Sequence, residues 1–148
     1  MSEGQRVLIL EARFYEDIAE QLVAGAGAAL DEVGVSHERI SVPGAFELPA
    51  ALAMAIDSGR FDGFVALGCV IRGETSHYDH VCGESARGLA MLAERHRIAL
   101  GFGVVTAENR EQAWERAALD RRNKGADAAK ACLAMMAIRA SLGAEPRG

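Results

Sequence analysis

The clearest chemical signal in the chain is the segment GCVIRGETSH at 68–77, where an apolar run ends in a polar loop and a helical pattern begins. The first backbone N–H groups of a helix lack partners within the helix and lie at the positive end of its dipole, so they can hold a phosphate. Thr75 or Ser76 could instead cap the helix with no ligand present. The pattern therefore indicates either an anion site or an ordinary helix start.

His77 falls in the first turn of this expected helix, beside the candidate anion site. A histidine there is suited to proton transfer near neutral pH, and the helix N-terminus favours its neutral, proton-accepting form. A surface histidine at a helix start is the alternative interpretation. His77 and His80 also form an HxxH pair. No further ligand is clearly spaced for a metal ion, so we predict no metal site.

Three aromatic residues and one acid could contact a flat or hydroxylated ligand. Phe14, Phe46 and Phe102 could each stack on a heterocycle or belong to the core. Glu47 could hydrogen-bond a polyol, or supply a negative charge near the start of a helix. The sequence leaves these alternatives open.

A group of cations near the C-terminus could bind a phosphate. Arg116 and Lys124 lie in the expected C-terminal helical region, and Arg121 and Arg122 stand near them. A guanidinium can grip a phosphate through two hydrogen bonds. A solvated helix face would have the same composition, so spacing alone does not separate the two interpretations.

Alternating strand and helix patterns supply the elements that must position these residues. Strands are predicted at 6–12, 37–42, 63–71 and 98–106, and helices at 15–33, 46–58, 76–95, 108–119 and 123–141. The alternation predicts an α/β sandwich with a parallel sheet and right-handed crossovers. Ligands of such sheets gather at the carboxyl ends of the strands, where most of the candidate residues stand.

Length and composition bound the remaining possibilities. The 148 residues fit one compact domain, 1–148, with about 143–148 as a frayed tail. The net charge of −5 and the lack of a basic stripe argue against a nucleic-acid partner. Three widely separated cysteines signal neither a disulfide framework nor a zinc site, and suggest reduced thiols in the cytoplasm. The apolar runs are too short for a signal peptide or a membrane span.

Five segments, taken in order and at their spacing, resemble the lumazine synthase family. They are ARF at 12–14, VPGAFELP at 42–49, LGCVIRGETSHYDHVCGESARGL at 67–89, GFGVVTAENREQAWERA at 101–117 and NKGADAA at 123–129. The resemblance covers nearly the whole chain. It implies a three-layer, flavodoxin-like α/β sandwich in which a four-stranded parallel sheet carries helices on both faces.

The resemblance also implies an activity. Lumazine synthases are transferases that join 5-amino-6-ribitylaminouracil to 3,4-dihydroxy-2-butanone 4-phosphate in the penultimate step of riboflavin biosynthesis. The products are 6,7-dimethyl-8-ribityllumazine, phosphate and water. The resemblance implies no metal or redox cofactor. A weakly catalytic lumazine- or riboflavin-binding paralogue and a scaffold protein on the same fold are the alternatives.

By resemblance, His77 is the proton shuttle and Arg116 the counter-charge of the phosphate, so these two are the expected catalytic residues. The expected contacts to the pyrimidine ring and ribityl chain are Phe14, Ala45, Phe46, Glu47, Val70 and Ile71. The expected contacts to the phosphate are Glu74, Thr75 and Arg116, with Lys124 nearby. Phe102, Arg116 and Lys124 are expected to come from a neighbouring subunit of a homo-oligomer.

One segment departs from the family pattern. Many members that form sixty-subunit shells have a glycine-rich link before NKG, whereas this chain has ALDRR at 118–122. The added charge and the missing glycines favour a free pentamer over a shell.

Overall fold

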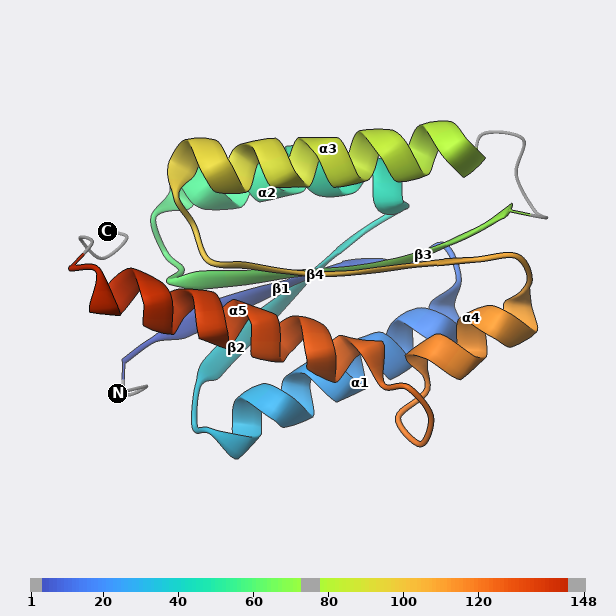
Figure 1. Ribbon diagram of the computed structural model, residues 1–148, viewed down its shortest axis with the longest axis horizontal. Coiled ribbons are helices and arrows are strands. Elements are labelled where there is room, and N and C mark those ends of the chain that lie inside the picture. The colour runs from blue at the N-terminus through green and yellow to red at the C-terminus, as the bar shows by residue number, and fades with distance from the viewer. Residues whose placement is uncertain (1–3, 73–77, 144–148) are drawn as a thin grey trace.

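The computed structural model describes residues 4–72 and 78–143 and is shown in Figure 1. These residues form a four-stranded parallel sheet with the strand order β2-β1-β3-β4. The strands are β1 (Arg6–Ala12), β2 (Ser36–Val42), β3 (Gly63–Ile71) and β4 (Leu100–Ala107). The central pair is therefore β1 and β3, and β2 and β4 are the edge strands.

Helices cover both faces of the sheet (Figure 1), which confirms the expected three-layer α/β sandwich. One face carries α1 (Glu16–Glu32), α4 (Arg110–Ala117) and α5 (Lys124–Ser141). The other face carries α2 (Leu48–Ser58) and α3 (Tyr78–His96), and a 3-10 turn, η1 (Ala45–Glu47), leads into α2. Consecutive strands are joined through helices, as parallel pairing requires.

Strand side chains alternate between two apolar cores because successive residues of a strand point to opposite faces. Ile9 belongs to the core beneath α1 and α5, together with Leu22. Leu10 belongs to the core beneath α2 and α3, together with Leu52. All of β3 is buried, as the uninterrupted apolar run at 63–71 predicts for a strand covered on both sides.

Two glycines let α5 pack directly against its neighbours. A Cβ atom at Gly125 would lie 2.0 Å from the carbonyl oxygen of Leu22 in α1, and one at Gly101 would lie 1.9 Å from that of Ala128 in α5. Such distances exclude any side chain, so these contacts require glycine. The start of α5, with Lys124, is consequently held against α1 and β4.

Two predicted helices begin later in the structure than in the prediction. The helix expected at 46–58 starts at Leu48, because the N–H of Gly44 donates to Glu47 Oε1 (2.9 Å) and that of Glu47 donates to the Gly44 oxygen (3.1 Å), closing η1. The helix expected at 108–119 runs from Arg110 to Ala117, because Asn109 caps it by accepting from the N–H of Gln112 (2.8 Å).

The strand expected at 98–106 starts at Leu100, because Arg97 turns the chain with a φ of 54° and Ile98 is still bonded to α3 through Ala93. The other observed ends match the prediction or differ from it by a single residue, except that the first two residues of the helix expected at 76–95 lie outside the described residues. Residues 144–148 of the expected tail also lie outside them. Within 4–72 and 78–143, no helix is both long and apolar enough to cross a membrane.

Candidate active site

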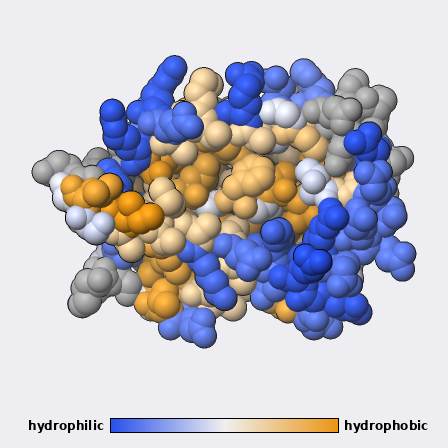
Figure 2. Space-filling view, viewed as in Figure 1, coloured by the Kyte–Doolittle hydropathy of each residue, from blue (hydrophilic) through white to orange (hydrophobic). Residues whose placement is uncertain are grey.

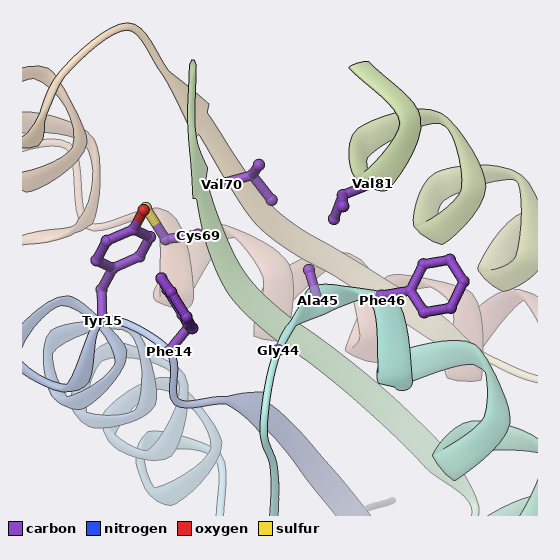
Figure 3. A pocket seen from close by; sticks show the side chains of 8 residues that line it. All are labelled: Phe14, Tyr15, Gly44, Ala45, Phe46, Cys69, Val70 and Val81. Atoms are coloured by element: carbon purple, nitrogen blue, oxygen red, sulfur yellow. The ribbon is translucent and has the colours of Figure 1, made fainter. Parts of the chain in front are cut away.

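A cavity of about 150 Å³ lies where the carboxyl ends of β1 and β3 meet (Figure 3). The chain leaves β1 toward α1 on one face, and α3 follows β3 on the other. Helices that depart to opposite faces open a crevice between neighbouring strands, which is where open α/β sheets bind ligands. The lining residues are Phe14, Tyr15, Gly44, Ala45, Phe46, Cys69, Val70 and Val81, and we call this space the apolar cavity.

Phe14 presents its ring to this cavity. The ring is 72% exposed and rests edge-on against buried Tyr15, with 4.9 Å between centroids and 85° between planes. Tyr15 also lies under the guanidinium of Arg110, at 5.4 Å. An exposed aromatic face supported by a buried ring is suited to stacking on a flat ligand.

Phe46 lies at the rim of the cavity. Figure 3 shows its ring turned toward α3 and away from Phe14. It stacks on His80, with 6.1 Å between centroids and 24° between planes. The small side chain of Ala45 stands between the two aromatic residues and leaves the space open.

Three further predicted contacts lie at the same end of the sheet. Val70 and Ile71 are buried at the carboxyl end of β3, where Val70 is paired with Thr106 of β4. The Glu47 carboxylate is exposed and caps the N–H of Gly44. Glu47 therefore closes the turn before α2, and its side chain remains exposed to solvent.

Three of the expected site residues fall between β3 and α3 in the sequence. Glu74, Thr75 and His77 lie outside the described residues. Of the side chains that are described, no group of three or more histidines, cysteines or acids is arranged to hold a metal ion.

A second cavity, of about 310 Å³, lies beside the edge strand β4. Its lining residues are Val104, Val105, Thr106, Arg116, Arg122, Lys124 and Asp127, and we call it the cationic cavity. Arg116 donates from Nη1 to the carbonyl oxygen of Thr106. Neither Arg116, Arg122 nor Lys124 forms an ion pair with any residue in the described ranges. The cavity is thus lined by three cations and one acid.

The two cavities have no lining residue in common. Phe102, which is 47% exposed on β4, lines neither of them. A single chain therefore does not bring Arg116, Lys124 or Phe102 into the cavity that contains Phe14. These are the three residues expected from a neighbouring subunit.

A buried acid near the carboxyl end of β1 holds a network of charged residues that sequence reasoning missed. Glu11 of β1 is 0% exposed. It accepts from Arg13 Nη1 (2.7 Å), from Ser41 Oγ (2.8 Å) and from Arg39 Nε. The N–H of Arg13 donates to the Val42 oxygen (3.0 Å). The acid inside an otherwise apolar strand was the signal that could have revealed this network.

The network extends to α1 through Glu20. Glu20 Oε2 lies 2.9 Å from Arg13 Nη1 and 2.7 Å from Arg39 Nη2. Hydrogen bonds from Arg39 and Arg13 hold the pKa of Glu20 below its ordinary value. The hydrogen bond to Glu11 likewise raises the pKa of Arg39. The loops that follow β1 and β2, which carry Phe14 and Ala45, are in this way tied to each other and to α1.

Known proteins are similar in sequence to this chain over nearly its full length. Residues 4–140 match the family model of 6,7-dimethyl-8-ribityllumazine synthase. The enzyme of that name from Afipia carboxidovorans is 51% identical over 144 residues, covering 94% of this chain and 88% of the relative. The one from Sphingopyxis alaskensis is 54% identical over 137 residues, covering 93% and 96%. 6,7-dimethyl-8-ribityllumazine synthase 1 from Rhizobium meliloti is 51% identical over 144 residues, covering 94% of each.

A solved structure shares the fold at low sequence identity. It is a fragment of a putative lipoprotein from Peptoclostridium difficile 630, with a TM-score of 0.50 and 9% identity, covering 88% of this chain and 96% of that one. Likeness at this identity concerns the fold alone.

The family match and the identities near one half decide the relationship: the chain belongs to the 6,7-dimethyl-8-ribityllumazine synthase family, the transferases that form lumazine in riboflavin biosynthesis.

Proposed function

We propose that the two cavities bind the two substrates of the lumazine synthase reaction. The apolar cavity takes the ring of 5-amino-6-ribitylaminouracil, and the cationic cavity takes the phosphate of 3,4-dihydroxy-2-butanone 4-phosphate. The observation that carries this proposal is the chemical contrast between the cavities. The apolar cavity offers the exposed ring of Phe14, which rests against buried Tyr15. The cationic cavity offers three cations without an acid partner in the described part of the chain.

In the apolar cavity, Phe14 stacks on the pyrimidine, and backbone groups of Val70 and Ile71 meet its edge. Ala45, Phe46 and Glu47 hold the ribityl chain, for which an exposed carboxylate is a suitable hydrogen-bond acceptor. The support for these roles is position. All six residues lie where the carboxyl ends of β1, β2 and β3 come together.

In the cationic cavity, Arg116 and Lys124 bind the phosphate, together with Glu74 and Thr75 from the segment before α3. A group of cations around one cavity both attracts the phosphate substrate and stabilises the phosphate as it leaves. His77 moves the protons. The substrate amine attacks the ketone, loss of water gives an imine, and loss of phosphate then requires a proton to be removed. Holding both substrates together supplies much of the acceleration.

We infer that each complete site is shared between two chains. One chain supplies the apolar cavity, and its neighbour supplies Phe102, Arg116 and Lys124. The separation of the two cavities on one chain supports this arrangement. So does the exposed apolar surface over β4 and α5, which Figure 2 shows facing the viewer. Phe102, Met135 and Ile138 are each more than 40% exposed there. Contiguous exposed apolar surface of this kind marks a protein interface.

The activity is tested by mixing the protein with both substrates and following lumazine formation by absorbance and fluorescence against a protein-free blank. Acceleration over the blank supports the proposal if His77→Ala lowers the turnover moderately and Arg116→Ala mainly weakens binding of the phosphate substrate. Tight binding of lumazine or riboflavin without acceleration would assign the chain to the binding paralogues instead.

Site sharing is tested by mixing two weakened variants, Phe14→Ala and Arg116→Ala, after dissociation and reassembly. If the residues come from different chains, roughly one site in four regains both wild-type residues, and the activity of the mixture exceeds the mean of the two parents. Activity equal to that mean would show that both residues act within one chain. Each variant reassembled with itself is the control.

We further propose a cytoplasmic homopentamer that does not assemble into a shell, because the link at 118–122 is charged and lacks glycine. Light scattering should give the mass of five chains. A particle of megadalton mass would contradict this proposal.

A further inference from the structure

Arg122 lines the cationic cavity, although the family resemblance assigns it no role. It lies in the link between α4 and α5, and its backbone is fixed there. The N–H of Arg122 donates to the Glu115 oxygen (3.1 Å), and the next N–H, of Asn123, donates to the Ala118 oxygen (3.1 Å). Asn123 then turns the chain into α5 with a φ of 52°. The link therefore holds Arg122 beside the cavity.

The neighbouring Arg121 has the same side chain and a different environment. Its guanidinium lies 3.1 Å from Glu115 and 3.7 Å from Asp120, and it does not line the cavity. Arg122 has no acid partner in the described part of the chain. Two adjacent arginines thus differ in one respect that matters for binding: the charge of Arg121 is compensated locally, and that of Arg122 is not.

The uncompensated charges of Arg122, Arg116 and Lys124 surround one space. Like charges that line one cavity repel each other. An anion bound between them attracts each of them and so offsets that repulsion. Asp127 is the only acid that lines this cavity among the described residues, and it forms no ion pair with any of the three. The cavity therefore retains a net positive charge that a phosphate can neutralise.

We propose that Arg122 is a third cation of the phosphate site, which strengthens the binding of the phosphate-bearing substrate and of the phosphate product through its charge. The inference rests on the proposed function, in which the cationic cavity holds that phosphate. Because Arg122 is exposed, its contribution is electrostatic and decreases with salt.

The test is a graded charge series at the two adjacent positions, Arg122→Gln and Arg122→Glu against Arg121→Gln and Arg121→Glu. Steady-state kinetics give the KM of each substrate, and inorganic phosphate serves as a competitive probe. We expect the KM for the phosphate substrate to rise roughly two- to fivefold in Arg122→Gln, and further in Arg122→Glu. The inhibition constant of inorganic phosphate should rise in parallel, and the KM for ribitylaminouracil should not change.

The Arg121 variants should alter these constants less than the matching Arg122 variants, and the difference should shrink at high salt. Equal effects at the two positions would overturn the inference, as would a rise in both KM values together. Arg116→Ala distinguishes a failure of the role of Arg122 from a failure of the cationic cavity as the phosphate site. If it raises the KM for the phosphate substrate while the Arg122 series has no effect, only the role of Arg122 fails. If neither has any effect, the cationic cavity is not the phosphate site, and the proposed function of this cavity fails with it.

Discussion

Arginines gather in two regions, the network around Glu11 and the cationic cavity, and acid partners compensate their charges only in the first. In the Glu11 network, Arg13 and Arg39 are both paired with Glu11 and Glu20. Around the cationic cavity, Arg116 and Arg122 have no acid partner among the described residues. A paired guanidinium fixes the surrounding backbone and offers little net charge to a ligand. A guanidinium without an acid partner keeps its net charge available for an anion.

Paired arginines contribute to stability, and arginines without an acid partner contribute to binding. Substitutions in the two regions should therefore change different measured quantities. Changes in the Glu11 network should lower the free energy of unfolding. Changes around the cationic cavity should raise the KM for one substrate while leaving the free energy of unfolding nearly unchanged.

The largest expected effect is that of Glu11→Ala on stability. Removing the buried carboxylate leaves Arg13 and Arg39 with Glu20 alone, and leaves Ser41 without its acceptor. We expect the free energy of unfolding, measured by urea denaturation, to fall by ~2–4 kcal/mol. A fall of less than ~0.5 kcal/mol would show that the network does not stabilise this end of the sheet.

The other end of β2 offers a matched control. Glu38 pairs with Arg6 (3.1 Å) and Arg60 (2.8 Å), but its side chain is 39% exposed. Glu38→Ala removes as many arginine partners as Glu11→Ala does, and should cost ~0–1 kcal/mol because water already screens these pairs. Equal losses from the two substitutions would show that burial of Glu11 is not what makes its network strong.

The next effect is that of Arg116→Ala on substrate binding. Loss of a charged hydrogen-bond donor should weaken binding of the phosphate substrate by ~1.5–3 kcal/mol, roughly a ten- to hundredfold rise in its KM. The KM for ribitylaminouracil should stay nearly constant. Lys130→Ala is the control, because Lys130 is an exposed cation of α5 that does not line the cavity. Equal changes in both KM values would contradict the division of substrates between the cavities.

Phe14→Ala should have the converse and smaller effect. Its ring is 72% exposed, so its loss should barely change the free energy of unfolding. The lost stacking should weaken binding of ribitylaminouracil by ~0.5–1.5 kcal/mol. This corresponds to a roughly two- to tenfold rise in its KM. Phe14→Tyr keeps an aromatic face and should remain near the wild type. A KM for ribitylaminouracil that does not change in Phe14→Ala would remove this residue from the site.

The fold could be predicted because each strand pattern is local to a short segment of the sequence. The apolar run at 63–71 gave both ends of β3 correctly, since it is bounded by polar residues on each side. The start of β4 was wrong because Ile98 and Ala99 are apolar and buried but belong to the connection after α3. Hydrophobicity reports burial, and burial does not distinguish a strand from a packed connection.

The loops after β1 and β2, which carry Phe14 and Ala45 of the apolar cavity, could be anticipated because parallel strands bring their carboxyl ends together. The charge network could not, because it depends on the register between strands. Glu11 faces Ser41 and Ile9 faces Arg39 only once β1 and β2 are paired. Nor could sequence tell Arg121 from Arg122. In a link without periodicity, nothing indicates which of two adjacent side chains faces a cavity.

The smallest predicted effect concerns the pH dependence of the paired arginines. Hydrogen bonds from Arg39 and then Arg13 depress the pKa of Glu20 from its ordinary value of 4.5. A depressed carboxyl pKa stabilises the fold at pH values above the unfolded pKa, and this stability is lost as the pH falls through the folded pKa. The wild type should therefore exceed Glu20→Gln in free energy of unfolding near neutral pH, and the difference should shrink below 4.5.

Urea denaturation of both proteins across that range measures the difference. Because Glu20 is half exposed, the difference should be small even at its maximum. A difference that stays constant as the pH falls would mean that Glu20 stabilises α1 through packing alone. The contrast between paired and unpaired arginines would then rest on Glu11. Its substitution by alanine has the larger expected effect, because water reaches Glu20 and does not reach Glu11.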